Sequence, residues 1–284
     1  MAKITAALIK ELRDQTGAGM MDVKKALTEA EGDMARAKEI IRATGIQAAG
    51  AREGRKAQEG LIASTVVEGG QGQIGYAVEL NSETDFVAKT PQFVEFGQEV
   101  IDDVAKADAS NAEQVDAAPS KSGTVKETVE EAGSLFHEHV KVGQVARVEG
   151  PRVEIYAHRK SVEMPPSIVA MIATDEAGAQ VAHEVALQIS AMSPKWLSRE
   201  DVPADVVESE RRVATEKSQA EGKPEKIIPK IVEGRLNAFF KETVLLEQQY
   251  VKDTSKTIGD LFKQAGGKAL AFARLEVGKG DEEE

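Results

Sequence analysis

Apolar residues recur with the spacing of a helix in three short stretches of the first 45 residues. The three apolar faces consist of Leu8, Ile9 and Leu12, of Met20, Val23 and Leu27, and of Ala37, Ile40 and Ile41. Glycines are expected to end these helices at Gly17, near Gly32 and at Gly45. Helices of this length are marginal alone, so the pattern predicts a bundle in which they pack on one another.

The periodicity changes to that of strands after residues 46–60, a small and charged segment that suits a linker or a frayed helix. Residues 61–68 alternate between apolar and polar, residues 69–72 form a glycine-rich turn, and residues 74–80 form a returning strand. This pattern predicts a β-hairpin.

Two helices are predicted after this hairpin. Thr90 suits the N-cap and Pro91 the first helical position of a helix that carries apolar residues at helical spacing. Residues 105–125 are rich in alanine, aspartate and serine, which predicts a loop, and a further helix is expected from Val125 to His139.

A similar order of elements recurs after residue 144. Strands are predicted at residues 145–149 and 153–157, on either side of the turn Gly150-Pro151, and an apolar strand at residues 167–173. Asp175-Glu176 then leads into an amphipathic helix. We therefore predict two related halves, each an antiparallel sheet covered by helices on one face.

A further helical pair is inserted in the second half, between about residues 199 and 245. Residues 208–220 are strongly charged, residues 225–247 carry apolar positions at helical spacing, and Gly222 and Pro224 lie between them. The pattern predicts an antiparallel helical hairpin whose tip is solvated or contacts another chain.

These elements predict an α+β protein. Residues 1–55 are expected to form an N-terminal three-helix domain, similar to ubiquitin-associated domains, with its linker. Residues 56–143 are expected to form one core subdomain, and residues 144–284 a second that contains the helical hairpin.

Composition narrows the range of partners. The net charge of −12 disfavours binding to nucleic acid, and the lack of cysteine excludes disulfides, thiolate zinc sites and cysteine nucleophiles. Residues 1–5 lack the apolar region of a secretory signal, and the longest apolar run, residues 168–173, is far shorter than the roughly 20 residues that span a bilayer. We expect a cytoplasmic protein that binds neither nucleic acid nor membrane.

No group of residues in the sequence predicts catalysis, a metal or a cofactor. His137 and His139 lack an evident third ligand, and residues 69–72 lack the lysine of a phosphate-binding loop. No Ser-His-Asp pattern or nucleophile elbow is present. We predict a protein that is not an enzyme, and an unrecognised hydrolase remains an alternative.

Three motifs resemble those of the elongation factor Ts family. They are Thr16 to Leu27 near the N-terminus, the pentapeptide Thr84-Asp85-Phe86-Val87-Ala88 after the first hairpin, and Lys230 to Leu236 in the helical insertion. Their order, with the two-half core between them, matches the architecture of that family. The resemblance implies a guanine-nucleotide exchange factor for the GTPase elongation factor Tu.

The resemblance also implies roles for individual residues. The corner formed by Thr84, Asp85, Phe86 and Val87 is expected to wedge beside a helix near the partner's magnesium and phosphate site. From position alone, Asp85 would be an acid favoured at a helix start and Phe86 a core residue. By the same resemblance, further contacts with the partner are expected from Lys24, His158, Tyr250 and Val251.

Two further hypotheses concern binding. The helical hairpin is expected either to approach the partner's other domains or to pair two copies of the chain. The alternative to an exchange factor is an adaptor that binds partners through its helical domain without driving exchange.

Phe136-His137 and Lys252 depart from residues often found in the family.

Overall fold

A computed structural model describes residues 4–16, 18–50, 54–70 and 72–280, and it consists of helices and antiparallel strands. The α+β class predicted from the sequence is thereby confirmed. The expected helix end at Gly17, part of the linker (51–53), Gln71 of the turn and the acidic residues 281–284 lie outside the described residues.

Three helices form an N-terminal bundle, as predicted: α1 (Ala6–Thr16), α2 (Met20–Glu29) and α3 (Met34–Gly50). They share a small core that includes Leu12, Val23 and Leu27. The third helix was expected to end at Gly45 but continues to Gly50. A glycine inside a helix costs only about 1 kcal/mol relative to alanine, so Gly45 does not stop the helix when residues that tolerate it follow.

The first sheet contains β1 (Glu59–Gly69), β2 (Gly72–Ser82) and β5 (Lys141–Gly150), in the order β1-β2-β5, with all pairs antiparallel. The sequence pattern places residues 145–149 in the second half of the core. They instead belong to β5, which crosses the predicted boundary at residue 143 and pairs with β2. Alternation predicts that a segment is a strand, but it does not identify its partner.

The second sheet contains β6 (Arg152–Arg159), β7 (Pro166–Thr174) and β10 (Ala269–Glu276), in the order β10-β7-β6. Each sheet is therefore made by an adjacent pair of strands and a third strand that follows intervening helices. The turn at Gly150-Pro151 leads from the first sheet to the second rather than joining two paired strands.

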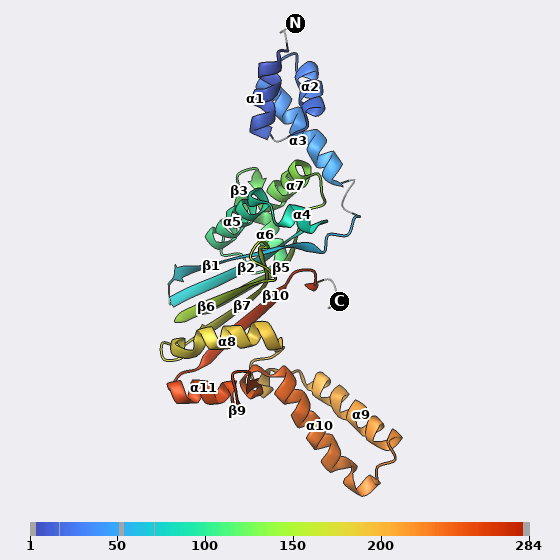
Figure 1. Cartoon of the computed structure of the whole chain (residues 1–284), viewed down its shortest axis with the longest axis vertical. Helices are drawn as coiled ribbons and strands as arrows, with labels where there is room; N and C mark the ends of the chain where they lie inside the picture. Colours follow the sequence, from blue (N-terminus) through green and yellow to red (C-terminus); the bar gives the residue numbers. More distant parts are fainter. Residues whose placement is uncertain (1–3, 17, 51–53, 71, 281–284) are drawn as a thin grey trace.

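The two sheets pack face to face, with helices on their outer sides (Figure 1). An apolar layer between the sheets includes Ala77, Met171 and Leu275. The outer helices are α5 (Pro91–Lys106) and α7 (Val125–Phe136) on the first sheet, and α8 (Ala179–Met192) and α11 (Ile258–Ala265) on the second.

Residues 105–125 contain short regular elements where a loop was expected. These elements are α6 (Ala112–Ala117), β3 (Pro119–Ser120) and β4 (Gly123–Thr124). Asn111 caps α6, and Thr124 forms a capping box with Glu127 at the start of α7. The polar residues that suggested a loop are in part the caps of these elements. The helix expected to reach His139 ends at Phe136, because His137 adopts a left-handed conformation with φ 57°.

The helical insertion extends from the body of the molecule as two adjacent helices, α9 (Ala204–Ala220) and α10 (Ile228–Thr243) (Figure 1). Their shared core is small and consists of Ala214, Ile228, Val232 and Leu236, with Phe240 packed against it. The short strands β8 (Gln249–Tyr250) and β9 (Asp253–Thr257) then lead to α11. Within the described residues, the helices lack the combination of length and apolar character needed to cross a membrane.

Candidate partner-binding surface

A sharp corner between β2 and the short helix α4 (Asp85–Ala88) presents Phe86 to solvent. Phe86 is 70% exposed, whereas Ala88 is fully buried and Val87 packs against the core of the first sheet. Thr84 caps α4, since its hydroxyl accepts a hydrogen bond from the backbone N–H of Val87 at 3.4 Å. An ordinary core role for Phe86 is therefore wrong, and the corner does project as the motif implied.

Lys89 lies against both side chains at the tip of the corner. Its Nζ is 4.4 Å from the centre of the Phe86 ring and 3.7 Å from Asp85 Oδ2. An exposed cation–π contact stabilises by about 0.5–1 kcal/mol, and an exposed ion pair by less than about 1 kcal/mol. These contacts are weak enough to exchange for contacts with a partner.

The base of the corner is held by two carboxylates that cross between two loops. Glu138 accepts hydrogen bonds from the backbone N–H of Thr84, at 3.0 Å, and from its hydroxyl. In return, Glu83 accepts a hydrogen bond from the backbone N–H of His139 at 2.7 Å. We call this arrangement of Glu83, Thr84, Glu138 and His139 the reciprocal clamp.

Arg55 adds a third segment to the reciprocal clamp. Its Nη1 lies 3.3 Å from Glu83 Oε1, and its carbonyl oxygen lies 2.9 Å from His139 Nδ1. The hydrogen bond from His139 and then the charge of Arg55 lower the pKa of Glu83 below the usual 4.5 of a glutamate. The clamp thus favours the charged form of Glu83 and joins the corner to the first residues after the N-terminal bundle.

Aromatic packing supports the corner from below. The rings of Phe93 and Phe136 meet edge to face with their centres 5.3 Å apart, and Phe96 lies beside both. Phe93 is fully buried. Phe136, which precedes the departure from the family pattern at His137, therefore belongs to the core that supports the corner.

The N-terminal bundle carries Lys24 on the exposed side of α2, close in sequence to two exposed methionines. Met20 is 57% exposed and Met21 is 75% exposed. This small apolar surface beside a lysine suits contact with another protein, because flexible methionine side chains adapt to the surface that they meet.

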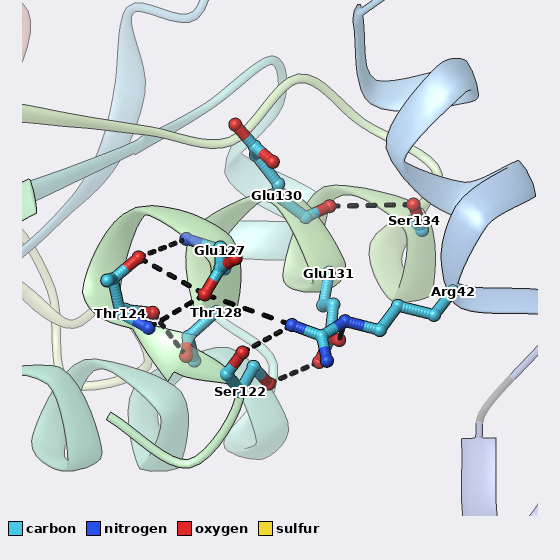
Figure 2. A network of polar contacts seen from close by, with 8 residues as sticks. All are labelled: Arg42, Ser122, Thr124, Glu127, Thr128, Glu130, Glu131 and Ser134. Carbon is cyan, nitrogen blue, oxygen red and sulfur yellow. Dashed lines mark hydrogen bonds and ion pairs between the residues drawn. The ribbon is translucent and has the colours of Figure 1, made fainter. Parts of the chain in front are cut away.

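Arg42 of α3 joins the bundle to the core (Figure 2). Its Nε lies 2.9 Å from Glu131 Oε1, and its Nη2 donates to the carbonyl oxygen of Ser122. Glu131 also accepts from the Ser122 hydroxyl, and Glu127 lies 3.9 Å from the guanidinium. An open groove of about 470 Å³ lies between the bundle and α7, with Arg42, Glu131 and Leu135 among its lining residues.

His158 lies on β6, the edge strand of the second sheet, opposite Ile168 of β7. Its Nδ1 is 3.2 Å from the hydroxyl of Tyr156. The Tyr156 ring in turn meets that of His183 on α8 edge to face, with the ring centres 6.2 Å apart. His158 is half-buried and thus remains accessible to a partner.

Tyr250 and Val251 lie at the turn between β8 and β9, also beside α8. The Tyr250 hydroxyl donates to Glu184, and burial together with this bond raises the pKa of Tyr250 to about 12. Val251 is exposed, while its backbone N–H donates to the buried Gln188 at 3.0 Å. Lys252, the second departure from the family pattern, pairs with Glu184 at 2.6 Å.

The structure thus brings the predicted residues together in three places. Thr84 to Val87 form the corner, and Lys24 lies on the bundle. His158 and Tyr250 are both linked to α8, through the neighbouring residues His183 and Glu184.

Comparison with known proteins gives the family. A model of the family described as "Elongation factor TS" matches residues 83–279. The chain is 78% identical over 282 residues to "Elongation factor Ts" of Bifidobacterium animalis subsp. lactis, with 99% of each chain covered. The chain belongs to the elongation factor Ts family. It is also 76% identical over 291 residues to the protein of that name from Bifidobacterium adolescentis, with 100% of each covered. A more distant relative, from Kocuria rhizophila, is 49% identical over 279 residues, which cover 98% of this chain and 100% of the relative.

Membership of the elongation factor Ts family confirms the resemblance drawn from the three motifs, and it identifies a factor of translation elongation. The range matched by the family model begins at Glu83. It therefore contains the corner, His158, the helical hairpin and Tyr250, while the relatives cover the N-terminal bundle as well.

The sequence did not reveal several residues that hold the corner in this elongation factor Ts protein. Glu83, Lys89 and Glu138 are ordinary charged residues in a chain that has 84 of them, 36 basic and 48 acidic. Lys89 had a detectable signal, since it lies four residues after Asp85, at the C-cap of α4. Within the part of the chain that the structure describes, no three His, Cys, Asp or Glu side chains gather as metal ligands would.

Proposed function

We propose that this protein is a guanine-nucleotide exchange factor that binds elongation factor Tu, disturbs its Mg²⁺ and phosphate site, and thereby releases GDP so that GTP can bind. The observation that carries the proposal is the exposed Phe86 on a corner braced by the reciprocal clamp, in a member of the elongation factor Ts family. Such a protein acts by binding, without making or breaking a covalent bond, and works in the cytoplasm.

Exchange is a problem of linked binding. The factor weakens GDP binding by the same ratio by which GDP weakens binding of the factor. A GTPase of this kind holds GDP by backbone donors around the phosphates and by Mg²⁺. Displacing the structure near the ion removes charge-assisted contacts with the nucleotide. A ring that enters beside that structure is therefore well suited to release GDP.

The energetics require more than the ring. Weakening GDP binding a thousandfold takes about 4 kcal/mol, whereas burying one phenyl ring contributes roughly 1.5–3 kcal/mol. The remainder must come from a wide interface. We assign to it Lys24 on the bundle, His158 on the second sheet, and Tyr250 with Val251, while Thr84 and Val87 flank the wedge. The helical hairpin would reach the partner's other domains or a second copy of this chain.

The hydrogen bonds at the base of the corner explain how one side chain can displace structure in another protein. A wedge transmits force only if its base yields less than the structure that it enters. Phe86 stands on a helix of four residues, but the residues before it are tied to the loop after α7 by the clamp. Asp85, whose carboxylate pairs with Lys89, would reach the partner at the same time as the ring.

The test is the release of fluorescent GDP from purified elongation factor Tu. The wild-type protein is expected to accelerate release at substoichiometric concentration. Phe86→Ala is expected to reduce the maximal rate by roughly 10–100-fold, which corresponds to the loss of the buried ring. Leu270→Ala, which truncates another exposed apolar residue, is expected to behave as wild type.

Asp85→Ala completes this test. Near-wild-type release by both Phe86→Ala and Asp85→Ala would eliminate the wedge. Capture of elongation factor Tu without faster release of GDP, in the wild-type protein, would instead indicate the adaptor that binds but does not drive exchange.

A further inference from the structure

Glu79 is a buried acid in β2 that the proposed function does not use. Its residue is 1% exposed, and it lies in the strand that ends at the corner. A carboxylate is rarely buried to this extent, because removing a charge from water is costly unless hydrogen bonds replace the lost hydration. The contacts of Glu79 therefore indicate what the buried charge holds in place.

Three segments of the chain donate hydrogen bonds to this one carboxylate. Oε1 accepts from the side-chain amide of Asn81 and from the backbone N–H of Gly278, both at 2.7 Å. Oε2 accepts from the backbone N–H of Gln144 at 3.0 Å. Glu79 thus joins β2, β5 and the segment that follows β10.

The fold is shaped around the carboxylate. The pairing of β2 with β5 shifts in register between Val78 and Leu80, so Gly143 and Gln144 lie opposite Glu79. A Cβ atom on Gly143 would lie 2.7 Å from Glu79 Oε2, which is closer than side chains tolerate. The bulge and the glycine together make room for the acid and direct the N–H of Gln144 toward it.

Residues 277–280, which we call the strap, run from the second sheet to Glu79. The N–H of Val277 still donates to Ser167, at the start of β7, at 2.9 Å. At the next residue, Gly278, the chain reaches Glu79 with φ 78°, and a Cβ there would lie 2.6 Å from the carbonyl oxygen of Gln58. The strap therefore connects the two sheets at the end of β2, beside the start of β1.

This connection lies on β2, the strand that leads into the corner. Asn81, which is bound to Glu79, is followed by Ser82, whose hydroxyl donates to the carbonyl oxygen of Thr84 at 3.0 Å. The reciprocal clamp holds the front of the same segment. The end of β2 is thus fixed on one side by the clamp and on the other by Glu79 and the strap.

We propose that Glu79 is a positioning residue that ties the strap to the end of β2 and so holds the corner rigid against the load of a bound GTPase. The effect on a bound GTPase rests on the proposed function, whereas the link between Glu79, the strap and the corner does not. It makes the strap, which comes from the second sheet, part of the support of a side chain presented by the first sheet.

The substitution Glu79→Gln tests the proposal with little change in shape. An amide has one acceptor atom, so its NH₂ group must face the N–H of either Gly278 or Gln144. A buried donor left without an acceptor costs about 1–3 kcal/mol, so protection from hydrogen exchange at residues 82–88 and 278–280 is expected to fall roughly tenfold. Glu68→Gln, at an exposed carboxylate of β1, is the matched control and is expected to leave protection unchanged.

A second variant approaches the same contact from the strap. Gly278→Ala forces a side chain into the left-handed conformation and against Gln58, while it leaves Glu79 intact. It is expected to lower protection at residues 82–88 as well. If Glu79 acts through the strap, combining the two substitutions lowers protection no further than the stronger single variant does.

The kinetic readout separates positioning from simple loss of stability. Both variants are expected to lower the maximal rate of GDP release severalfold at temperatures where they remain folded, with little change in the concentration that gives half-maximal release. Unchanged protection at residues 82–88, or equal loss of protection at α11 and at the corner, would overturn the proposal. If protection changes as expected but the wild-type protein does not accelerate GDP release, the proposed function fails and the structural link stands.

Discussion

Thr84 donates both its backbone N–H and its hydroxyl to one carboxylate, that of Glu138, which lies 54 residues later in the chain. This pair closes the base of the corner that presents Phe86. The relationship makes the stability of the corner depend on a loop beyond α7, outside the pentapeptide motif itself.

Glu138→Ala is expected to lower the free energy of unfolding by about 1–3 kcal/mol, because a partly buried N–H of Thr84 loses its acceptor. Urea unfolding followed by circular dichroism measures the change. Glu130→Ala is the matched control, since that carboxylate belongs to α7 and points away from the ion-pair network (Figure 2). Equal stability of the two variants would show that the clamp contributes nothing.

Arg42→Gln is expected to loosen the N-terminal bundle from the core without unfolding either. Each exposed ion pair contributes at most about 1 kcal/mol, but Arg42 combines contacts to Glu131 and Ser122. The protein has no cysteine, so spin labels at Lys24→Cys and Glu113→Cys report one distance. The distribution of that distance is expected to broaden in Arg42→Gln.

The control for the bundle is Arg36→Gln. Arg36 pairs with Glu39 within α3 and is expected to leave the distance distribution as in the wild-type protein. A distribution in Arg42→Gln as narrow as in the control would mean that packing of α3 on α7 alone holds the bundle.

The pH dependence of the free energy of unfolding is expected to reveal the stabilisation that comes from the ionised Glu83 carboxylate. Its pKa is lowered below 4.5 by the hydrogen bond from His139 and then by Arg55, so the folded state favours the carboxylate. The stabilisation is therefore present above pH 4.5 and is lost as the pH falls through the lowered pKa. Unfolding by urea at a series of pH values is expected to show a shallower acid loss in Glu83→Gln than in the wild-type protein. Arg55→Gln removes the weaker contribution and should give an intermediate slope.

An alkaline titration of the tyrosine phenols is expected to show that Tyr250 loses its proton at higher pH than an ordinary tyrosine. Its raised pKa of about 12, against an ordinary value of 10.0, means that the folded state retains the proton longer than the unfolded state does. The stabilisation is complete below pH 10.0 and is lost as the pH rises through about 12. The difference in phenolate absorbance between the wild-type protein and Tyr250→Phe isolates this group among the three tyrosines. Glu184→Gln is expected to move the titration to lower pH, and an unmoved titration would show that the bond to Glu184 does not raise the pKa of Tyr250.

Local patterns predicted much of the fold. The apolar run at residues 168–173 is the central part of β7, and Thr90 with Pro91 begins α5 as expected. Capping and alternation depend on neighbouring residues, so they can be recognised in a single sequence. The exposure of Phe86 was different, because hydrophobicity alone would have buried the ring, and only the motif predicted a projecting corner.

The features that were missed depend on residues far apart in the sequence. Glu79 and Gly278 are 199 residues apart, and nothing near either one predicts their hydrogen bond. β5 was recognised as a strand but placed in the wrong sheet, since its pattern suits any antiparallel partner. The continuation of α3 past Gly45 follows from the small local cost of one glycine.

The apolar layer between the two sheets has a consequence for how the protein is made. In sequence, α8 and the helical hairpin lie between β7 and its neighbour β10. A nascent chain therefore emerges from the ribosome with the inner face of the first sheet already present and its covering sheet unfinished until α9 and α10 have been synthesised. During that interval β7 lacks its neighbour β10 and the apolar layer lacks Leu275, so chaperone protection should matter most while the insertion is being translated.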